Sequence, residues 1–284
     1  MELKSLADVE LRDATFPLSR SAPSTFLPVL RTPVILRELF NLGVLDRDLS
    51  KVLVAGGRVV GCCLVERGAT GGYVSGLGTD ALSQQRGGAR VLLEAVVAAA
   101  HKAGLAQLTM EVSEAEAGPT GALQALGFVP VRTRHRLALQ GPPDRSLLPE
   151  SLTEDPTSER RIAAVSVPLA LDFLLAHGPK HPGAAVHPAV LAKLAGRLSA
   201  AAYQIDGRTV AAVVADKERK LVVGLGGDAA YLAPLAVFAA ARFLSAHVDS
   251  IAEDDPALAA LEAAGFVRIA VRKELSLSLQ SAAA

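Results

Sequence analysis

The amino-acid sequence predicts an α/β protein that contains one kind of domain twice. Three observations lead to this prediction. Short β-prone segments alternate with alanine-rich runs that are long enough to form helices. Gly-Gly or Asp-Gly pairs separate neighbouring β-prone segments, as they do in hairpins with tight turns. Sequence anchors from the first half recur in the second half at nearly constant separation, which indicates an internal repeat.

The first half opens with a predicted β-hairpin. Residues 52–54 and 59–65 are rich in valine, and Gly56-Gly57 between them suits a turn with positive φ angles. A further β-prone segment covers residues 73–77. These three segments predict the start of a sheet in which neighbours along the chain are antiparallel.

The loop after this sheet has the composition of an anion site. It reads Thr-Asp-Ala-Leu-Ser-Gln-Gln-Arg-Gly-Gly-Ala-Arg-Val at residues 79–91, and a helical run to residue 103 follows. Gly87 and Gly88 let the backbone approach an anion, and Arg86 and Arg90 add positive charge. Free N–H groups and the helix dipole converge at a helix start. We therefore predict a phosphate site here.

The remaining elements of the first half follow in order. Residues 107–112 form a strand candidate, and residues 122–127 form a short helix that a glycine ends. Residues 131–139 alternate in character, with Arg132, Arg134 and Arg136 on one side.

Two motifs in this order resemble those of a known family. Gln84-x-x-Gly87-x-Ala89 resembles the pyrophosphate loop of the GNAT acetyltransferases, and Leu126-Gly127-Phe128 is similar to the end of their short helix. The resemblance covers about residues 50–140. It implies a mixed, mostly antiparallel sheet flanked by helices, with acetyl-CoA as cosubstrate. It also implies that the strand at residues 74–79 splays from its neighbour and pairs with the pantetheine arm. The implied cofactor-binding residues are Leu77, Gly78, Thr79, Gln84, Gln85, Arg86, Gly87, Gly88, Ala89 and Arg90.

The second half repeats the first. Three anchor pairs align, at offsets of 150, 148 and 138 residues: Gly57 with Gly207, Gly76 with Gly224, and Gly127 with Gly265. The final strands align at the last offset, with Arg134, Leu137 and Leu139 matching Arg272, Leu275 and Leu277. The chain therefore resembles two tandem GNAT domains, expected at residues 1–141 and 160–284, with a proline-rich linker at residues 142–159.

The second copy has lost ten residues where the first copy has its phosphate loop. After Asp228 the chain offers apolar residues and Pro234, which has no N–H, in place of glycines and arginines. We therefore expect a degenerate C-terminal domain, and coenzyme A binding by the N-terminal domain alone.

Composition excludes several other classes of protein. The 284 residues carry 29 basic and 29 acidic side chains, and only 4% are aromatic, so neither a nucleic-acid nor a membrane partner is expected. No apolar signal segment begins the chain, and a cytoplasmic location is expected. Cys62 and Cys63 point to opposite faces of a strand and are expected as core thiols. No metal is expected at His177, His181 and His187, because prolines and a glycine interrupt their helix.

Catalytic residues are less clearly marked. The tyrosine acid frequent in the family falls at Leu123, and its asparagine falls at Glu116. Glu66 is the first candidate for general base and Glu111 the second, with water as the third possibility. His135 lies in the arginine-rich strand, which is interpreted as a polar sheet face able to attract an anionic acceptor.

The leading hypothesis is an acetyl-CoA-dependent N-acetyltransferase that acts on an unidentified small-molecule amine or amino-group acceptor. The alternative is a non-catalytic coenzyme A-binding sensor or interaction protein, which the missing tyrosine and asparagine favour. A third possibility is that the degenerate domain serves as the surface of a homodimer.

Overall fold

The computed structural model describes residues 1–20, 33–68, 71–114, 121, 123–148, 160–179 and 188–280. These residues divide into two compact units. Unit 1 comprises the described residues of Met1–Arg132 and Arg272–Ala284, and unit 2 comprises those of Thr133–Val271.

Unit 1 contains a mixed, mostly antiparallel sheet. Its strand order is β1 (Glu2–Ser5), β2 (Lys51–Ala55), β3 (Arg58–Arg67), β4 (Gly71–Thr79), β5 (Gln107–Ser113) and the second part of β12 (Phe266–Ser278). Only β4 and β5 are parallel neighbours in this order. The β2–β3 hairpin turns at Gly56 and Gly57, whose φ angles are 56° and 74°. The predicted hairpin is confirmed.

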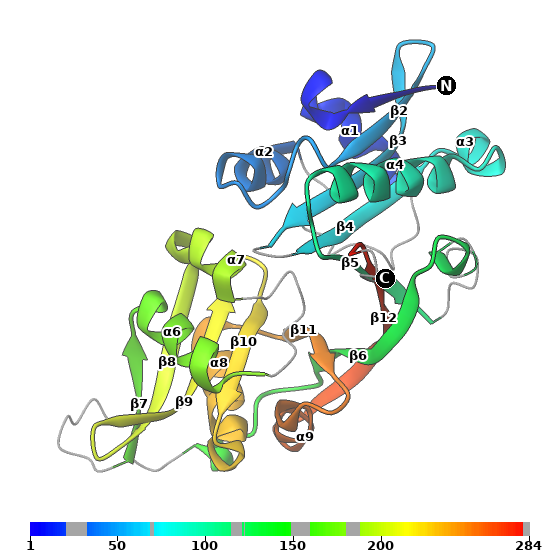
Figure 1. Cartoon of the computed structure of the whole chain (residues 1–284). Coiled ribbons are helices and arrows are strands. Elements are labelled where there is room, and N and C mark those ends of the chain that lie inside the picture. Colours follow the sequence, from blue (N-terminus) through cyan, green and yellow to red (C-terminus); the bar gives the residue numbers. More distant parts are fainter. Residues whose placement is uncertain are drawn as a thin grey trace. The chain divides into compact units, whose positions relative to one another are not determined.

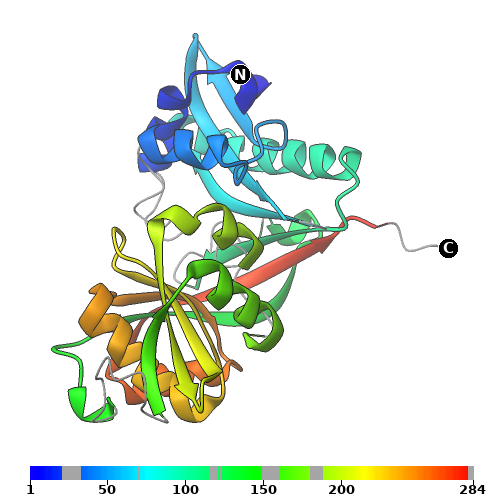
Figure 2. The ribbon, with the colours of Figure 1, turned by 90° about the vertical axis from the view of Figure 1, so that its left-hand side faces the viewer.

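Helices cover both faces of this sheet. They are α1 (Leu11–Arg20), α2 (Pro33–Asn41), α3 (Ala81–Gln85) and α4 (Gly88–Lys102), besides a short 3-10 turn at Leu6–Asp8. Leu92, Leu93 and Val96 of α4 pack into a core with Leu108 and Phe128. Helix α1 contacts β3 and β4, and Figures 1 and 2 show α1 and α2 on the side of the strands opposite to α4.

Unit 2 repeats this plan. Its strand order is β6 (Val129–Leu139), β11 (His247–Ala252), β10 (Leu221–Gly227), β9 (Arg208–Asp216), β8 (Leu198–Ile205) and β7 (Arg160–Val165). Again a single neighbouring pair in this order, β10 and β11, is parallel. The β8–β9 hairpin turns at Asp206 and Gly207, with φ angles of 49° and 74°. This turn repeats that of unit 1, as the sequence predicts.

The helices of unit 2 also lie on both faces of its sheet. They are α6 (Val167–His177), α7 (Pro188–Lys193), α8 (Leu232–Phe243) and α9 (Pro256–Ala263), with 3-10 turns at Arg145–Leu147, Ala195–Arg197 and Ala229–Tyr231. Helices α8 and α9 share a core with Ala211 and Val213 of β9. Leu174 of α6 packs against Gly224 from the opposite face.

The final strand of each repeat lies in the other unit. Residues 131–139 form the predicted strand, but β6 pairs with β11 of unit 2 and places Leu137 in the core of that unit. Strand β12 in turn pairs with β5 of unit 1, where Leu275 joins the core beside α4 (Figure 1). The sequence does not predict this exchange, because the two strands share one pattern and either strand fits either sheet.

The compact units consequently divide the chain after Arg132 and after Val271, and not at the predicted linker. The ranges 1–141 and 160–284 remain a prediction about the repeated sequence. Most of the predicted linker, from residue 149 to residue 159, lies outside the described residues.

Candidate functional site

The start of α4 forms a loop that is open to solvent. Asp80 caps the short helix α3 by accepting a hydrogen bond from the Ser83 N–H at 2.7 Å. The chain then turns at Gly87, which has a φ of 74°, and enters the 15-residue helix α4. Gln84, Gln85, Arg86 and Gly87 are all exposed. The predicted loop therefore lies at a true helix N-terminus.

Three backbone donors at this terminus point out of the helix. The first helical hydrogen bond runs from the Val91 N–H to the Gly87 carbonyl, at 3.1 Å. No acceptor in the described part of the chain pairs with the N–H groups of Gly88, Ala89 or Arg90, and Gly87 offers no side-chain cap. Such donors, together with the helix dipole, make a site for an anion.

The two glycines of the loop have different roles. A Cβ on Gly87 would meet no atom within 4 Å, so Gly87 is required for its positive φ. A Cβ on Gly88 would lie 2.8 Å from the Ser83 carbonyl oxygen and 3.1 Å from Leu53. Gly88 therefore allows the helix start to pack closely on the preceding turn.

The predicted arginines lie at the surface beside this turn. Arg86 is exposed, and Arg90 forms an ion pair with Glu94 of the next helical turn at 2.7 Å. An exposed pair at this spacing is worth only about 0.3–0.5 kcal/mol, so an anion can displace it at little cost.

Strands β4 and β5 separate next to this loop. Their parallel pairing covers Gly71–Val74 and Gln107–Met110, but β4 continues to Thr79 and β5 to Ser113. Residues 75–79 include the predicted Leu77, Gly78 and Thr79. They keep β3 on one edge, and no strand of the described residues pairs with their other edge. An extended ligand can pair with such an open backbone edge.

A buried serine marks the point where the strands part. Ser75 is skipped in the register between β3 and β4, where Val65 lies opposite Val74 and Leu64 opposite Gly76. Its side chain is 5% exposed, and its Oγ has no hydrogen-bond partner among the described residues. A buried hydroxyl without a partner costs stability, which makes it a candidate for a ligand contact. No sequence pattern singles out this residue, because a serine in a strand is common.

The two candidate bases are both buried in unit 1. Glu66 is 5% exposed and lies opposite Tyr73 in the β3–β4 register. Glu111 is also 5% exposed and forms an ion pair with Arg272 of β12, with Oε2 and Nη1 3.3 Å apart. The Glu111 carboxylate is therefore already part of a structural ion pair.

The internal repeat gives each candidate an equivalent in unit 2. The offset of 150 residues relates Glu66 to buried Asp216, and the offset of 138 relates Glu111 to buried Asp249. Asp216 accepts a hydrogen bond from the Arg219 N–H at 3.1 Å and pairs with that side chain. Carboxylates at these positions thus also serve the fold. Ser75, in contrast, corresponds to Val223 and is polar only in unit 1.

The equivalent helix start of unit 2 differs from this loop in its residues. Asp228 caps the turn Ala229–Tyr231 by accepting from the Ala230 N–H, and α8 then starts at Leu232 with Pro234 in its first turn. No arginine, lysine or glycine lies between Asp228 and Pro234. The start of α8 therefore has neither the glycines nor the arginines that are found at the start of α4.

Several other residues that the sequence analysis singles out are buried in the structure. Leu123, at the place of the family's tyrosine, is fully buried in the core of unit 1, and Glu116 lies outside the described residues. Arg134 and His135 are only 2% and 3% exposed, and Arg134 donates to the Ser250 carbonyl at 3.0 Å. Arg134 and His135 are therefore not part of an exposed polar face, whereas Arg132 and Arg136 of the same strand are partly exposed. The attraction of an anionic acceptor to this strand stays a prediction.

Cys62 and Cys63 are fully buried free thiols, as predicted. Burial raises the pKa of Cys63 to about 12 and raises the pKa of Cys62 as well, which makes both thiols unreactive near neutral pH.

Within the described residues, no group of three His, Cys, Asp or Glu side chains is placed to hold a metal, and His181 and His187 lie outside them. No helix in the described part of the chain is both long enough and apolar enough to cross a membrane.

Solved structures share this arrangement over nearly the whole chain. A tandem GNAT protein from the clavulanic acid biosynthesis pathway matches with a TM-score of 0.67 and 16% identity, covering 99% of this chain and 100% of its own. A putative acetyltransferase from Pyrococcus horikoshii matches with a TM-score of 0.67 and 10% identity, covering 98% and 89%. A GCN5-related N-acetyltransferase from Sphaerobacter thermophilus matches with a TM-score of 0.64 and 13% identity, covering 99% and 96%.

No family model matches the sequence, and no curated protein matches it either. At these identities the structural matches establish the fold. The chain has the tandem GNAT fold that its two motifs and its internal repeat predict.

Proposed function

We propose that the protein is an acetyl-CoA-dependent N-acetyltransferase in which unit 1 alone binds coenzyme A. The observation that carries this proposal is the difference between the two repeats. Unit 1 combines unpaired N–H groups at the start of α4 and a loop of glycines and arginines with an open edge on β4. Unit 2 keeps the parted strands, but α8 has Pro234 in its first turn and no glycine, arginine or lysine lies between Asp228 and Pro234.

The diphosphate of coenzyme A would bind the N–H groups of Gly88, Ala89 and Arg90, with the exposed Arg86 beside them. The pantetheine arm would pair with the open edge of residues 75–79, as an added strand does. The Ser75 hydroxyl would donate a hydrogen bond to this arm or to the thioester, which gives the buried Oγ the partner that it lacks.

Transfer then needs an acceptor amine and a group that removes its proton. The amine nitrogen attacks the thioester carbonyl carbon, the C–N bond forms and the C–S bond breaks, and the thiolate takes up a proton from solvent. We assign the removal of the amine proton to Glu66, because its carboxylate is buried at the end of β3, opposite Tyr73 of β4. The acceptor is a small molecule with an amino group, which the tandem fold by itself does not identify.

Two measurements on the intact chain test this function. Calorimetric titration with coenzyme A should give one site per chain. Incubation with acetyl-CoA and a panel of amino acids, aminoglycosides and polyamines should release free thiol only when an acceptor is present. Two equivalent sites would contradict the assignment to unit 1. One site without turnover on any amine would instead support the coenzyme A-binding sensor, which buried Leu123 in place of a tyrosine acid favours.

A further inference from the structure

Unit 2 contains a cavity at the ends of its parted strands. Parallel pairing of β10 and β11 covers only Leu221–Val222 and His247–Val248, although the strands continue to Gly227 and Ala252. The cavity beyond this point has a volume of about 340 Å³. It is lined by His177, Gly178, Pro179, Gly226, Gly227, Leu232, Ala252, Asp254, Asp255 and Pro256.

This volume falls in the range of small-ligand sites, about 300–1,000 Å³. The charge of coenzyme A disfavours its binding here. The cavity adjoins the helix start that lacks the phosphate-binding glycines, and two carboxylates belong to its lining. Burying a diphosphate beside these two carboxylates, with no arginine or lysine in the lining, would be strongly unfavourable. The cavity is therefore a different kind of site from that of unit 1.

The chemistry of the lining residues favours a cation. None of the ten is an arginine or lysine, while Asp254 is exposed at the rim and Asp255 is partly buried. Leu232, Ala252 and the two prolines give the remaining wall an apolar character. We propose that this cavity binds a small organic cation, namely a primary ammonium group on a short apolar body.

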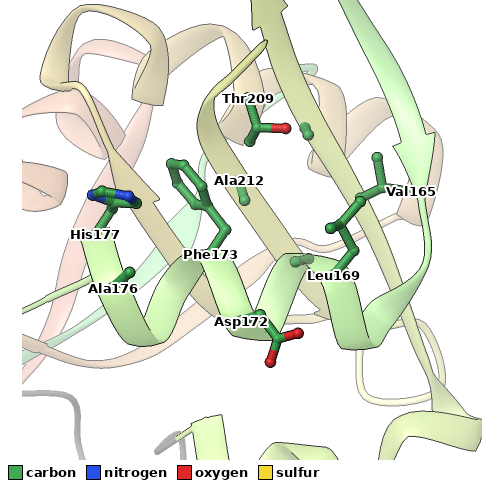
Figure 3. A pocket seen from close by; sticks show the side chains of 10 residues that line it. Val165, Leu169, Asp172, Phe173, Ala176, His177, Thr209 and Ala212 are labelled. Atoms are coloured by element: carbon green, nitrogen blue, oxygen red, sulfur yellow. The ribbon is translucent and has the colours of Figure 1, made fainter. Parts of the chain in front are cut away.

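A second cavity of unit 2 is less suited to such a cation. It has a volume of about 290 Å³ and lies beside α6, where His177 lines both cavities. Val165, Leu169, Phe173 and Ala212 make its walls apolar, and the Asp172 carboxylate points away from Phe173 and Thr209 (Figure 3). Asp172 is the single acidic residue of this lining, whereas the first cavity has two.

The titration of Asp255 agrees with a cation ligand. Burial raises its pKa, Asp254 raises it further, and the Ala257 N–H and Arg134 oppose the shift. A bound ammonium stabilises the ionised carboxylate, so affinity should be full above the pKa of Asp255 and should fall as the pH drops through it.

Calorimetry with a matched set of three compounds tests the site on the full chain in the absence of coenzyme A. n-Butylammonium should bind with one site per chain, whereas butan-1-ol and butyrate, which are neutral and anionic, should bind at least tenfold more weakly. Failure of butylammonium to bind, or equal binding of butyrate, would overturn the proposal. Because no coenzyme A is present, this result is separate from the fate of the proposed acetyl transfer.

Substitutions then locate the site. Asp255→Asn should lower butylammonium affinity about tenfold, while the asparagine still caps α9 by accepting from the Ala257 N–H. Asp228→Asn is the matched control, since Asp228 also caps a helical turn of unit 2 but does not line the cavity. Unchanged affinity in Asp255→Asn, or an equal loss in both variants, would refute the site.

Discussion

Replacing Ser75 by alanine should stabilise the fold and weaken coenzyme A binding at the same time. The Oγ of Ser75 is buried and has no hydrogen-bond partner among the described residues. A buried polar group left in this way costs about 1–3 kcal/mol, so its removal should raise the free energy of unfolding by about 1 kcal/mol. For a protein of this size, that gain corresponds to roughly 2–4 °C in Tm.

The effect on binding should have the opposite sign. If the hydroxyl donates to the bound ligand, its loss removes a hydrogen bond worth about 0.5–1.5 kcal/mol, which weakens acetyl-CoA affinity about two- to tenfold. Thermal unfolding of the ligand-free chain and calorimetric titration with acetyl-CoA measure the two effects separately.

Two serines serve as matched controls. Ser245 is fully buried and its Oγ also lacks a partner in the described structure, but it lies in unit 2. Ser245→Ala should therefore raise Tm and leave acetyl-CoA affinity unchanged. Ser50 donates to the Asp46 carbonyl at 2.6 Å and accepts from the Val65 N–H at 3.0 Å, so Ser50→Ala should lower Tm. If Ser75→Ala behaves like Ser50→Ala and binds acetyl-CoA normally, the reasoning about Ser75 is refuted.

Three further predictions follow from the same structure. Gly87→Val places a β-branched residue at a φ of 74°, which costs about 1–3 kcal/mol of strain, and should weaken coenzyme A binding at least tenfold. Gly104 also lies in open space, with a φ of 70°, so Gly104→Val should lower the stability by a similar amount without changing the affinity for coenzyme A. Equal affinities in both variants would show that the Gly87 loop does not bind coenzyme A. Glu66→Gln should lower the acetyl-transfer rate most strongly in the pH range where the wild-type rate depends on pH, and it should leave coenzyme A affinity unchanged. An unchanged pH–rate profile would assign the role of general base to Glu111 or to water. The variant Glu111→Gln distinguishes these two. The chain should lose stability between pH 9 and pH 12, because the pKa of the buried Cys63 thiol rises from 9.0 to about 12 on folding. At pH 11 the loss in the free energy of unfolding is about 3 kcal/mol. A Cys63→Ala variant with the same alkaline unfolding curve as the wild type would contradict this cause.

The local elements could be predicted from the sequence because their signals are local. Gly56-Gly57 and Asp206-Gly207 turn as hairpins with positive φ, and Gly87 begins α4 in the left-handed conformation. The cysteines are buried, as an apolar strand predicts. These features depend on the conformations allowed to a few neighbouring residues.

The partners of the last strands could not be predicted in the same way. Arg134 and Arg272 occupy equivalent positions of the repeat, and each is buried against the sheet of the other half. A pattern of alternating residues specifies a strand but does not specify which of two similar edges accepts it. Ser75 was missed for a related reason, since only tertiary packing removes every partner from its hydroxyl.

The exchanged strands also determine the order in which the two units can complete their folding during synthesis on the ribosome. Unit 2 uses one continuous stretch, Thr133–Val271, and can begin to fold as soon as that stretch has emerged. The sheet of unit 1 has to wait for β12, whose residues are synthesised after all of unit 2. The half that is translated first is therefore completed last, and its unpaired β5 edge is exposed during the interval, when a chaperone or a neighbouring nascent chain could reach it.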